Sequence, residues 1–265
     1  MTRSAASRRP GLGCAAVLGL VLFVALVALV AWLVLVQPRV LGAAGRGALP
    51  PNVPPVEPED VPAVDIHAEG RTAEQLREWS EPISKDTEIP GQALRAYANA
   101  EAVAREAWPE CHLRWNTLAG LGQIETRHGS YTGGLFNMGE LDEEGRADPP
   151  IFGPALDGRP GFAEVPDTDG GELDGDDEYD RAMGPMQFIP ETWRLFGLDA
   201  NGDGVADPQQ IDDAALSAAK MLCNGRDLAD PEDWSDAIFG YNQSGEYLTD
   251  VRDAANAYGT RQPAP

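Results

Sequence analysis

The most apolar stretch of the chain runs from residue 14 to residue 36, where 23 successive residues carry no charge. A helix of about 20 apolar residues crosses the hydrocarbon core of a bilayer, so this stretch predicts a transmembrane helix. Arg3, Arg8 and Arg9 precede it without any acidic residue. By the positive-inside rule, residues 1–13 are then cytoplasmic and the rest of the chain lies outside the cell. The pattern predicts a single-pass protein of the cell membrane, held by an uncleaved signal anchor.

A cleaved signal peptide is the alternative interpretation of this stretch. Signal peptides usually have an apolar core of about 7–15 residues, which is shorter than the run found here. Small residues from Gly42 to Ala44 leave a weak cleavage site. The length of the apolar run favours the anchor.

Residues 37–69 show no sustained helical or strand period and contain seven prolines. Proline-rich chain forms a semi-rigid spacer, and a disordered tether is the alternative. Both interpretations make 37–69 a linker between the membrane and the segment that follows.

From residue 70 to residue 259 the apolar positions recur mostly at helical spacing, and strand alternation is scarce. This pattern predicts an all-α domain of seven short helices around one core, with a short tail over 260–265. One helix is expected after Thr72, and the others at about 90–109, 112–128, 190–196, 212–223, 231–239 and 244–258. Residues 133–181, rich in glycine, proline and acidic residues, predict long acidic loops with at most a short hairpin.

Acidic residues outnumber basic ones by 43 to 20, which gives a net charge of −23. Residues 1–56 hold five arginines and no acid, so the rest of the chain carries 15 − 43 = −28. Binding to nucleic acid depends on basic residues that neutralise phosphates. The charge therefore excludes a nucleic-acid partner for this part of the chain.

A glutamate lies at the end of a core-facing helical stripe. The stripe has spacings of three and four and consists of Trp115, Leu118, Leu121, Gly122 and Glu125. Partial burial raises the pKa of a carboxyl, as a general acid near neutral pH requires. A structural glutamate at a helix end has the same pattern, so the pattern alone leaves both roles open.

Three short motifs occur in order along the predicted domain: QIETRHG at 123–129, RAMGPMQFIP at 181–190 and GYN at 240–242. Together they resemble the lytic murein transglycosylases of the B type, in the form found in high-GC Gram-positive bacteria. The resemblance covers residues 70–259 and implies a lysozyme-like transglycosylase domain. It implies that Glu125 is the catalytic acid and base, and that the sugar cleft is lined by Gln187, Tyr241 and Asn242.

The resemblance implies peptidoglycan as substrate and cleavage of the β-1,4 bond between N-acetylmuramic acid and N-acetylglucosamine. A transglycosylase would use the 6-hydroxyl of the muramic acid and leave a 1,6-anhydro end. A hydrolysing muramidase, the first alternative, normally has a second carboxyl about 5–9.5 Å from the acid. Candidates for it in the acidic loop are Asp167, Asp169, Asp174, Asp176, Asp177 and Asp180. The second alternative is a non-catalytic, calcium-stabilised module that binds the cell wall.

The segment from Asp199 to Asp207 matches the beginning of an EF-hand loop. Position 12 is Gln210, which cannot supply a bidentate carboxylate, so an acid later in the chain is expected to close the loop. The expected ligands all offer oxygen and are Asp199, Asn201, Asp203, the backbone carbonyl of Val205, and Asp213. This motif predicts a structural Ca²⁺ ion, and a turn with solvated acidic side chains is the alternative.

Cys111 and Cys223 are the two cysteines outside the predicted membrane helix. An even number of cysteines in an exported chain usually forms disulfides. We therefore predict a bridge between Cys111 and Cys223.

Overall fold

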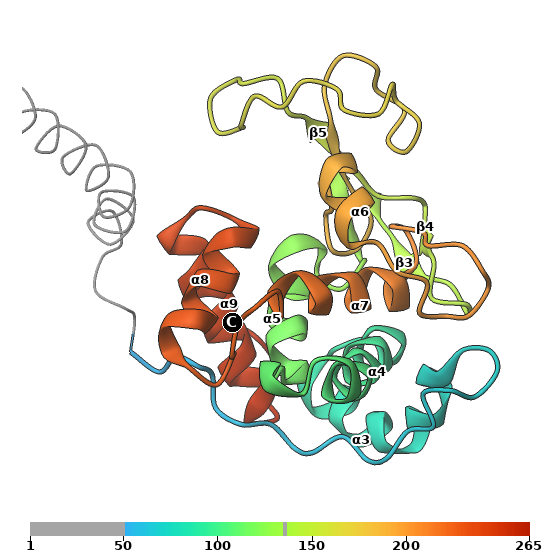
Figure 1. Cartoon of the computed structure of the whole chain (residues 1–265), viewed down its shortest axis with the longest axis vertical. Coiled ribbons are helices and arrows are strands. Elements are labelled where there is room, and N and C mark those ends of the chain that lie inside the picture. Colours follow the sequence, from blue (N-terminus) through green and yellow to red (C-terminus); the bar gives the residue numbers. More distant parts are fainter. Residues whose placement is uncertain (1–50, 135–136) are drawn as a thin grey trace, which may run out of the picture. The chain divides into compact units, whose positions relative to one another are not determined.

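The computed structural model describes residues 51–134 and 137–265 (Figure 1). This part of the chain is mostly helical, and its seven α-helices confirm the number expected from the sequence. The α-helices are α3 (Arg77–Thr87), α4 (Gly91–Ala107), α5 (Trp115–Thr126), α6 (Pro190–Phe196), α7 (Ile211–Leu222), α8 (Pro231–Tyr241) and α9 (Gly245–Gly259). Two short 3-10 helices are η1 (Thr72–Leu76) and η2 (Pro109–Cys111).

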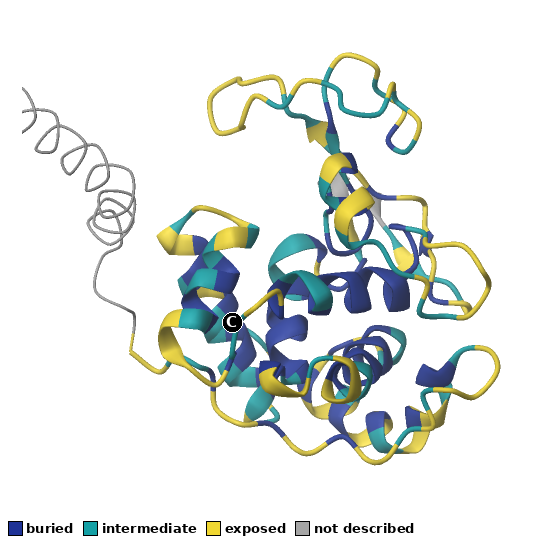
Figure 2. Cartoon of the chain, in the orientation of Figure 1, coloured by how far each residue is buried: buried dark blue, intermediate teal, exposed yellow. Residues whose placement is uncertain are grey.

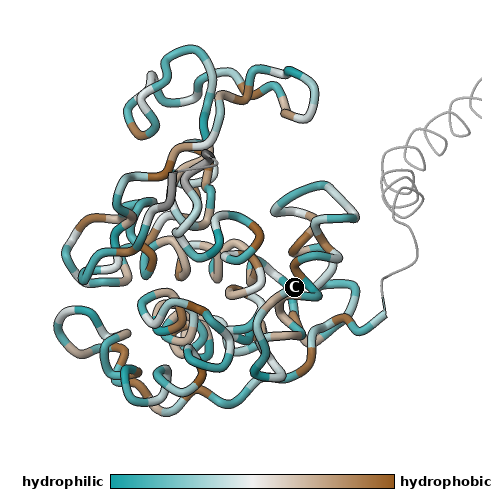
Figure 3. Tube along the Cα trace, turned by 180° about the vertical axis from the view of Figure 1, so that it is seen from behind, coloured by the Kyte–Doolittle hydropathy of each residue, from teal (hydrophilic) through white to brown (hydrophobic). Residues whose placement is uncertain are grey.

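The region expected to form loops also contains six short strands. They form three antiparallel pairs: β1 (Tyr131–Gly134) with β2 (Asn137–Met138), β3 (Glu140–Leu141) with β4 (Ala147–Asp148), and β5 (Phe152–Ala155) with β6 (Arg181–Met183). The sequence predicts at most one hairpin, because strands this short show no measurable alternation. Between β5 and β6 lies the acidic extension, residues 156–180. It projects away from the helices (Figure 1) and is largely hydrophilic (Figure 3).

Helix α5 packs against α4 and α9 within the core, and its inner face is buried (Figure 2). Trp115, Leu118 and Leu121 are at most 1% exposed, as the stripe predicts. Close approach of α9 depends on Gly120, because a Cβ there would lie 2.7 Å from the carbonyl oxygen of Val251. A larger residue at position 120 would push α9 away from α5.

Helix α4 anchors the first turn of α5, which has no side-chain cap of its own. Oε2 of Glu101 accepts a hydrogen bond of 2.7 Å from the backbone N–H of Trp115. Glu101 is 1% exposed, and burial raises its pKa against the opposing charge of Arg114. A buried carboxylate on α4 therefore positions the helix that carries Glu125.

Residues 53–64 lie on the helical body. The backbone N–H of Val56 donates to Oδ1 of Asn256 (2.8 Å), and Nε1 of Trp115 donates to the carbonyl of Glu59 (3.0 Å). Val61 is 4% exposed. The structure thus differs from the expected linker over these residues, because Val61 is buried in the core and Val53 and Val64 pack against it instead of remaining in solvent.

The predicted disulfide is confirmed. Cys111 of η2 and Cys223, directly after α7, are bonded with 5.2 Å between their Cα atoms. The bridge joins positions 112 residues apart, so it ties the segment that leads into α5 to the end of α7.

None of the helices in residues 51–134 and 137–265 is long and apolar enough to cross a membrane. The span predicted at residues 14–36 lies outside the described residues.

Candidate active site

Glu125 is the penultimate residue of α5, and its side chain is half-buried. Its Oε1 accepts a hydrogen bond from the hydroxyl of Tyr247 on α9. Burial raises the pKa of Glu125 to about 7, and the hydrogen bond from Tyr247 opposes part of that rise. Among the described residues, no charged group contributes to the shift. Glu125 therefore has the protonation behaviour of a general acid near neutral pH.

The end of α5 is held by Thr126, which is 2% exposed. Its Oγ1 donates to the carbonyl of Pro185 (2.7 Å) and accepts from the backbone N–H of Gly129 (2.8 Å). Thr126 therefore joins the Glu125 segment to the turn that follows β6.

This turn, residues 184–187, has unusual backbone geometry at both ends. Gly184 has φ +70°, and a Cβ there would lie 1.7 Å from the carbonyl oxygen of Pro208, so only glycine fits. Gln187 has φ 51°, and its Nε2 donates to the Gly184 carbonyl at 3.0 Å. Gln187 is half-buried, and its amide is held close to the turn.

Tyr241, the last residue of α8, contacts the same turn. Its hydroxyl donates to the carbonyl of Met186 at 2.7 Å. Burial, and then the charge of nearby Glu125, raises the pKa of Tyr241. Asn242 follows directly and is exposed. The structure thus gathers Glu125, Gln187 and Tyr241 around one turn and leaves Asn242 exposed beside Tyr241.

Tyr247 is the residue of this site that the sequence analysis missed. It starts the buried stripe of α9, which continues through Leu248, Val251 and Tyr258, and such a stripe predicts core packing. The available signal was its hydroxyl, because a buried tyrosine usually needs a hydrogen-bond partner. Which partner it finds depends on how α9 crosses α5.

His128, beyond the end of α5, is 4% exposed and lies between two tyrosines. Tyr258 donates to Oε1 of Gln123 at 3.1 Å, so its hydroxyl oxygen accepts from Nε2–H of His128 at 2.9 Å. Nδ1 of His128 then accepts from the Tyr97 hydroxyl at 3.1 Å. Burial lowers the pKa of His128 to about 3, so the ring is neutral and serves to anchor the chain.

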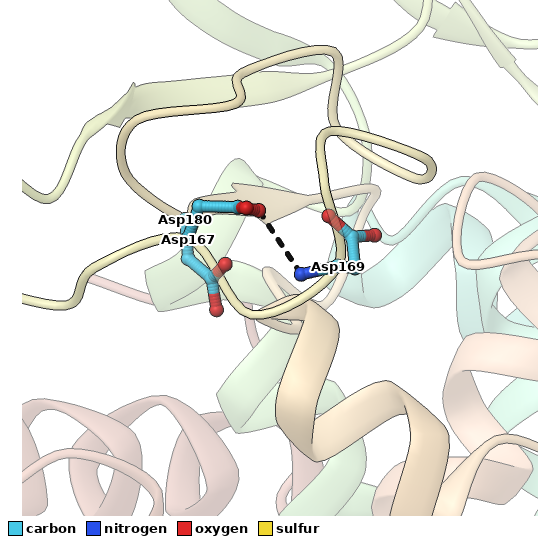
Figure 4. Close-up of side chains that lie close together, drawn as sticks. All are labelled: Asp167, Asp169 and Asp180. Carbon is cyan, nitrogen blue, oxygen red and sulfur yellow. Dashed lines mark hydrogen bonds between the residues drawn. The ribbon is translucent and has the colours of Figure 1, made fainter.

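In the acidic extension, Asp167, Asp169 and Asp180 bring carboxylate oxygens within 4.8 Å of one another (Figure 4). Asp180 is fully buried and accepts hydrogen bonds from the backbone N–H and the hydroxyl of Thr168, at 2.9 Å each. Asp167 accepts from Gly170 N–H at 2.8 Å. These aspartates have no ordered ligand spacing along the sequence, because the cluster forms only when the loop returns Asp180 to Asp167.

The other candidates for a second carboxylate are engaged within the extension or exposed. Asp174 accepts from the backbone N–H of Arg181 at 2.6 Å, and Asp176 accepts from the Arg181 side chain at 2.8 Å. Asp177 is exposed. None of the three appears among the groups that shift the pKa of Glu125.

In the loop from Asp199, the predicted closing acid is fully buried. Asp213 accepts from the backbone N–H of Ala200 (2.7 Å) and of Asp207 (3.0 Å). Burial raises the pKa of Asp213 to about 6, and the charge of Asp199 adds to the rise. The oxygen donors suit a hard cation. However, within the described residues, Asp199, Asp203 and Asp213 do not form a group as tight as the one in the extension.

Part of the chain is similar to a known protein family. Residues 178–234 match the family model described as the transglycosylase SLT domain. The matched segment includes Gln187 and the loop from Asp199, whereas Glu125 and Tyr247 lie outside it. The chain has no match among curated proteins or among solved structures. Together with the mostly helical fold, the match supports a glycan-cleaving enzyme of the lytic transglycosylase kind, which acts on peptidoglycan.

Proposed function

We propose that this protein is a lytic transglycosylase that cleaves the β-1,4 bond between N-acetylmuramic acid and N-acetylglucosamine and leaves 1,6-anhydromuramic ends. The observation that carries the proposal is the environment of Glu125. Its carboxyl is half-buried and has a pKa of about 7, and none of the carboxylates in the described part of the chain contributes to that pKa. A single carboxyl with these properties suits a reaction that needs one proton carrier and no water nucleophile.

In the first step, protonated Glu125 donates its proton to the glycosidic oxygen, and the bond from that oxygen to the anomeric carbon of the muramic acid breaks. In the second step, the 6-hydroxyl of the same sugar attacks the anomeric carbon, and Glu125 takes the hydroxyl proton. The attacking group is part of the substrate, so proximity supplies much of the rate. No water is consumed, and Glu125 ends in its starting state.

Tyr247 determines which oxygen of Glu125 faces the substrate. Its hydroxyl donates to Oε1, so Oε1 acts as an acceptor and the transferable proton is carried by Oε2. The hydroxyls of Tyr241 and Thr126 both donate to backbone carbonyls in the turn 184–187. This turn therefore fixes the positions of the sugar-binding side chains relative to the end of α5.

The mass of the products tests the proposal. Full-length protein incubated with purified peptidoglycan should release muropeptides one water lighter than those of a muramidase. If all products have hydrated, reducing ends, the reaction is hydrolysis and the proposal is wrong. Tight binding without any soluble product would favour a cell-wall-binding module.

We also infer a structural Ca²⁺ site in the loop from Asp199. The residues that would hold the ion are Asp199, Asn201, Asp203, the Val205 carbonyl and Asp213. Bound calcium would offset the repulsion between Asp199 and buried Asp213. Calcium should raise the melting temperature of the wild type but not of Asp203→Ala, and the two proteins should melt alike in chelator.

The calcium test has two controls. Asp250→Ala removes an exposed acid on α9 and should keep the response to calcium. Asp167→Ala tests the cluster in the extension. If this variant alone loses the response to calcium, the calcium site lies in the extension. If calcium does not change the melting temperature of the wild type, the Asp199 loop is a turn and not a calcium site.

Finally, we propose that residues 14–36 anchor the protein in the cell membrane, with the domain on the outer side. The uncharged run and the arginines before it support this arrangement. Protease added to intact protoplasts should remove the domain and spare the N-terminus. A mature N-terminus near Ala44 in the medium would instead identify a cleaved signal peptide.

A further inference from the structure

Gln209 lies in the segment between the Asp199 loop and α7 and is 8% exposed. Its side-chain amide pairs with both backbone groups of Ile151, the residue before β5. The N–H of Ile151 donates to Oε1 of Gln209 at 2.8 Å, and Nε2 of Gln209 donates to the carbonyl of Ile151 at 2.9 Å. The side chain of Gln209 thus holds Ile151 in the way that an antiparallel strand holds its neighbour.

The backbone of Gln209 is fixed as well as its side chain. Its N–H donates to Oδ1 of Asp207 at 2.8 Å, and its carbonyl accepts from the N–H of Ala147 on β4 at 2.9 Å. Ile151 is 3% exposed. Because a buried backbone N–H is rarely left without a partner, Ile151 depends on the amide of Gln209.

Ile151 connects Gln209 to the turn 184–187. Its carbonyl accepts a second hydrogen bond, from the N–H of Gly184, at 2.9 Å. The chain at Gln209 also packs on this end of the turn, since a Cβ on Gly184 would lie 3.2 Å from the backbone nitrogen of Gln209. The first residue of the turn is therefore held both through Ile151 and by direct packing.

The amide of Gln187 is oriented by the same part of the structure. Its Nε2 donates to the carbonyl of Gly184 at 3.0 Å. Its Oε1 lies against β5, because a Cβ on Gly153 would be 3.1 Å from it. The residues that orient Gln187 are thus the one that Ile151 holds and the one two positions after Ile151.

We propose that Gln209 is a positioning residue for substrate binding, which fixes Ile151 and Gly184 and thereby aims the amide of Gln187 at the sugar. The inference rests on the proposed function, in which Gln187 lines the sugar cleft. The pKa of Glu125 is shifted by burial and by the hydrogen bond from Tyr247. Loss of the Gln209 amide should therefore weaken substrate binding and leave the protonation of the catalytic acid unchanged.

The test compares full-length wild type with Gln209→Met, in which the side chain keeps its length and loses both hydrogen bonds to Ile151. On soluble glycan strands, KM should rise about tenfold, while kcat and the alkaline limb of the pH–activity profile stay unchanged. Gln75→Met is the matched control. The amide of Gln75 on η1 pairs in the same way with both backbone groups of Asp65, at 3.1 Å and 3.0 Å, and its loss should leave KM unchanged.

Hydrogen exchange without substrate separates the inference from the proposed function. In Gln209→Met, the backbone N–H groups of residues 183–188 should exchange about tenfold faster, whereas those of α5 should keep their wild-type rates. Gln75→Met should leave the exchange of both segments unchanged. If the wild type cleaves no glycan, the proposed function fails, and the exchange of residues 183–188 still decides whether Gln209 holds the turn.

Gln209→Glu is the second variant, to be used if Gln209→Met does not fold. Its carboxylate keeps the acceptor for the N–H of Ile151 and removes the donor to the carbonyl, so the same changes in KM and in exchange are expected. An unchanged KM, an equal rise in Gln75→Met, or a loss in kcat alone would overturn the inference. Faster exchange throughout the helices would also overturn it, because it would show a general loss of stability.

Discussion

Glu125 and the aspartates of the acidic extension are carboxylates in opposite environments. Glu125 accepts one side-chain hydrogen bond, from Tyr247, and burial raises its pKa to about 7. Asp167 and Asp176 accept hydrogen bonds from backbone N–H groups, which lower the pKa of each; the Arg181 side chain adds to the effect at Asp176. Burial disfavours the charged form, whereas donated hydrogen bonds favour it. A single carboxyl with few donors is therefore a better proton carrier than several carboxylates within a loop.

The largest expected effect is on strand cleavage, which should depend on Glu125 and not on the aspartates of the extension. Glu125→Gln should lower strand cleavage by at least about 100-fold, because positioned acid catalysis contributes roughly 10²–10⁴-fold. Asp180→Asn, at a buried site in the extension, should lower the melting temperature and retain cleavage. Product release measured on both folded variants checks this contrast. Comparable losses in both would assign part of the chemistry to the extension.

The second prediction concerns stability and pH. The folded-state pKa of Glu125 lies above the ordinary value of 4.5, so folding favours the protonated form. The contribution of this group to stability is fully present below pH 4.5 and is lost as the pH rises through 7. The difference between the two pKa values corresponds to about 3 kcal/mol. Urea unfolding at pH 5 and pH 8 should show a smaller loss for Glu125→Gln than for wild type, and equal losses would contradict the raised pKa.

The third prediction tests the hydrogen bond that Tyr247 donates to Glu125. Tyr247→Phe removes a hydrogen bond that lowers the pKa of Glu125, so the pKa should rise further. The alkaline limb of the pH–activity profile should move upward by about one pH unit. Tyr131→Phe removes the hydroxyl of an exposed tyrosine and should leave the profile in place. A limb that stays unchanged in Tyr247→Phe would mean that Tyr247 does not set the protonation of Glu125.

The smallest effect is expected at an exposed acid. Asp177→Asn should change the free energy of unfolding by less than about 0.5 kcal/mol, as is usual for exposed positions without special contacts. Urea unfolding at neutral pH measures it. A larger change would mean that charge on the extension acts on the helical body.

Much of the helical body could be predicted because its helices are amphipathic and end at recognisable residues. Asp230 and Ser244 cap α8 and α9 through their side chains, and Gly197 follows α6. The three antiparallel strand pairs were not predictable in detail, since their strands have two to four residues. The packing of residues 53–64 was also missed, because a proline-rich segment looks the same in a tether and in a segment that lies on a surface.

At the candidate site, local patterns could indicate Glu125, because its burial follows from its place on the stripe of α5. The sequence contained no comparable signal for Tyr247 or for the Asp167 and Asp180 cluster. In both cases the partners lie far apart in the chain or meet across an irregular loop. Their contacts depend on a helix crossing or a loop closure that local periodicity does not specify.

The sequence by itself determined which residues face the core, where most helices end, and which two cysteines were available to pair. These properties follow from short-range spacing and from the chemistry of each side chain. The tertiary structure alone decided that Tyr247 hydrogen-bonds to Glu125, that the turn 184–187 receives hydrogen bonds from both Thr126 and Tyr241, and that His128 is buried between Tyr97 and Tyr258. The physical reason is that the protonation and orientation of a side chain depend on the groups that replace its water. Those groups come from distant parts of the chain.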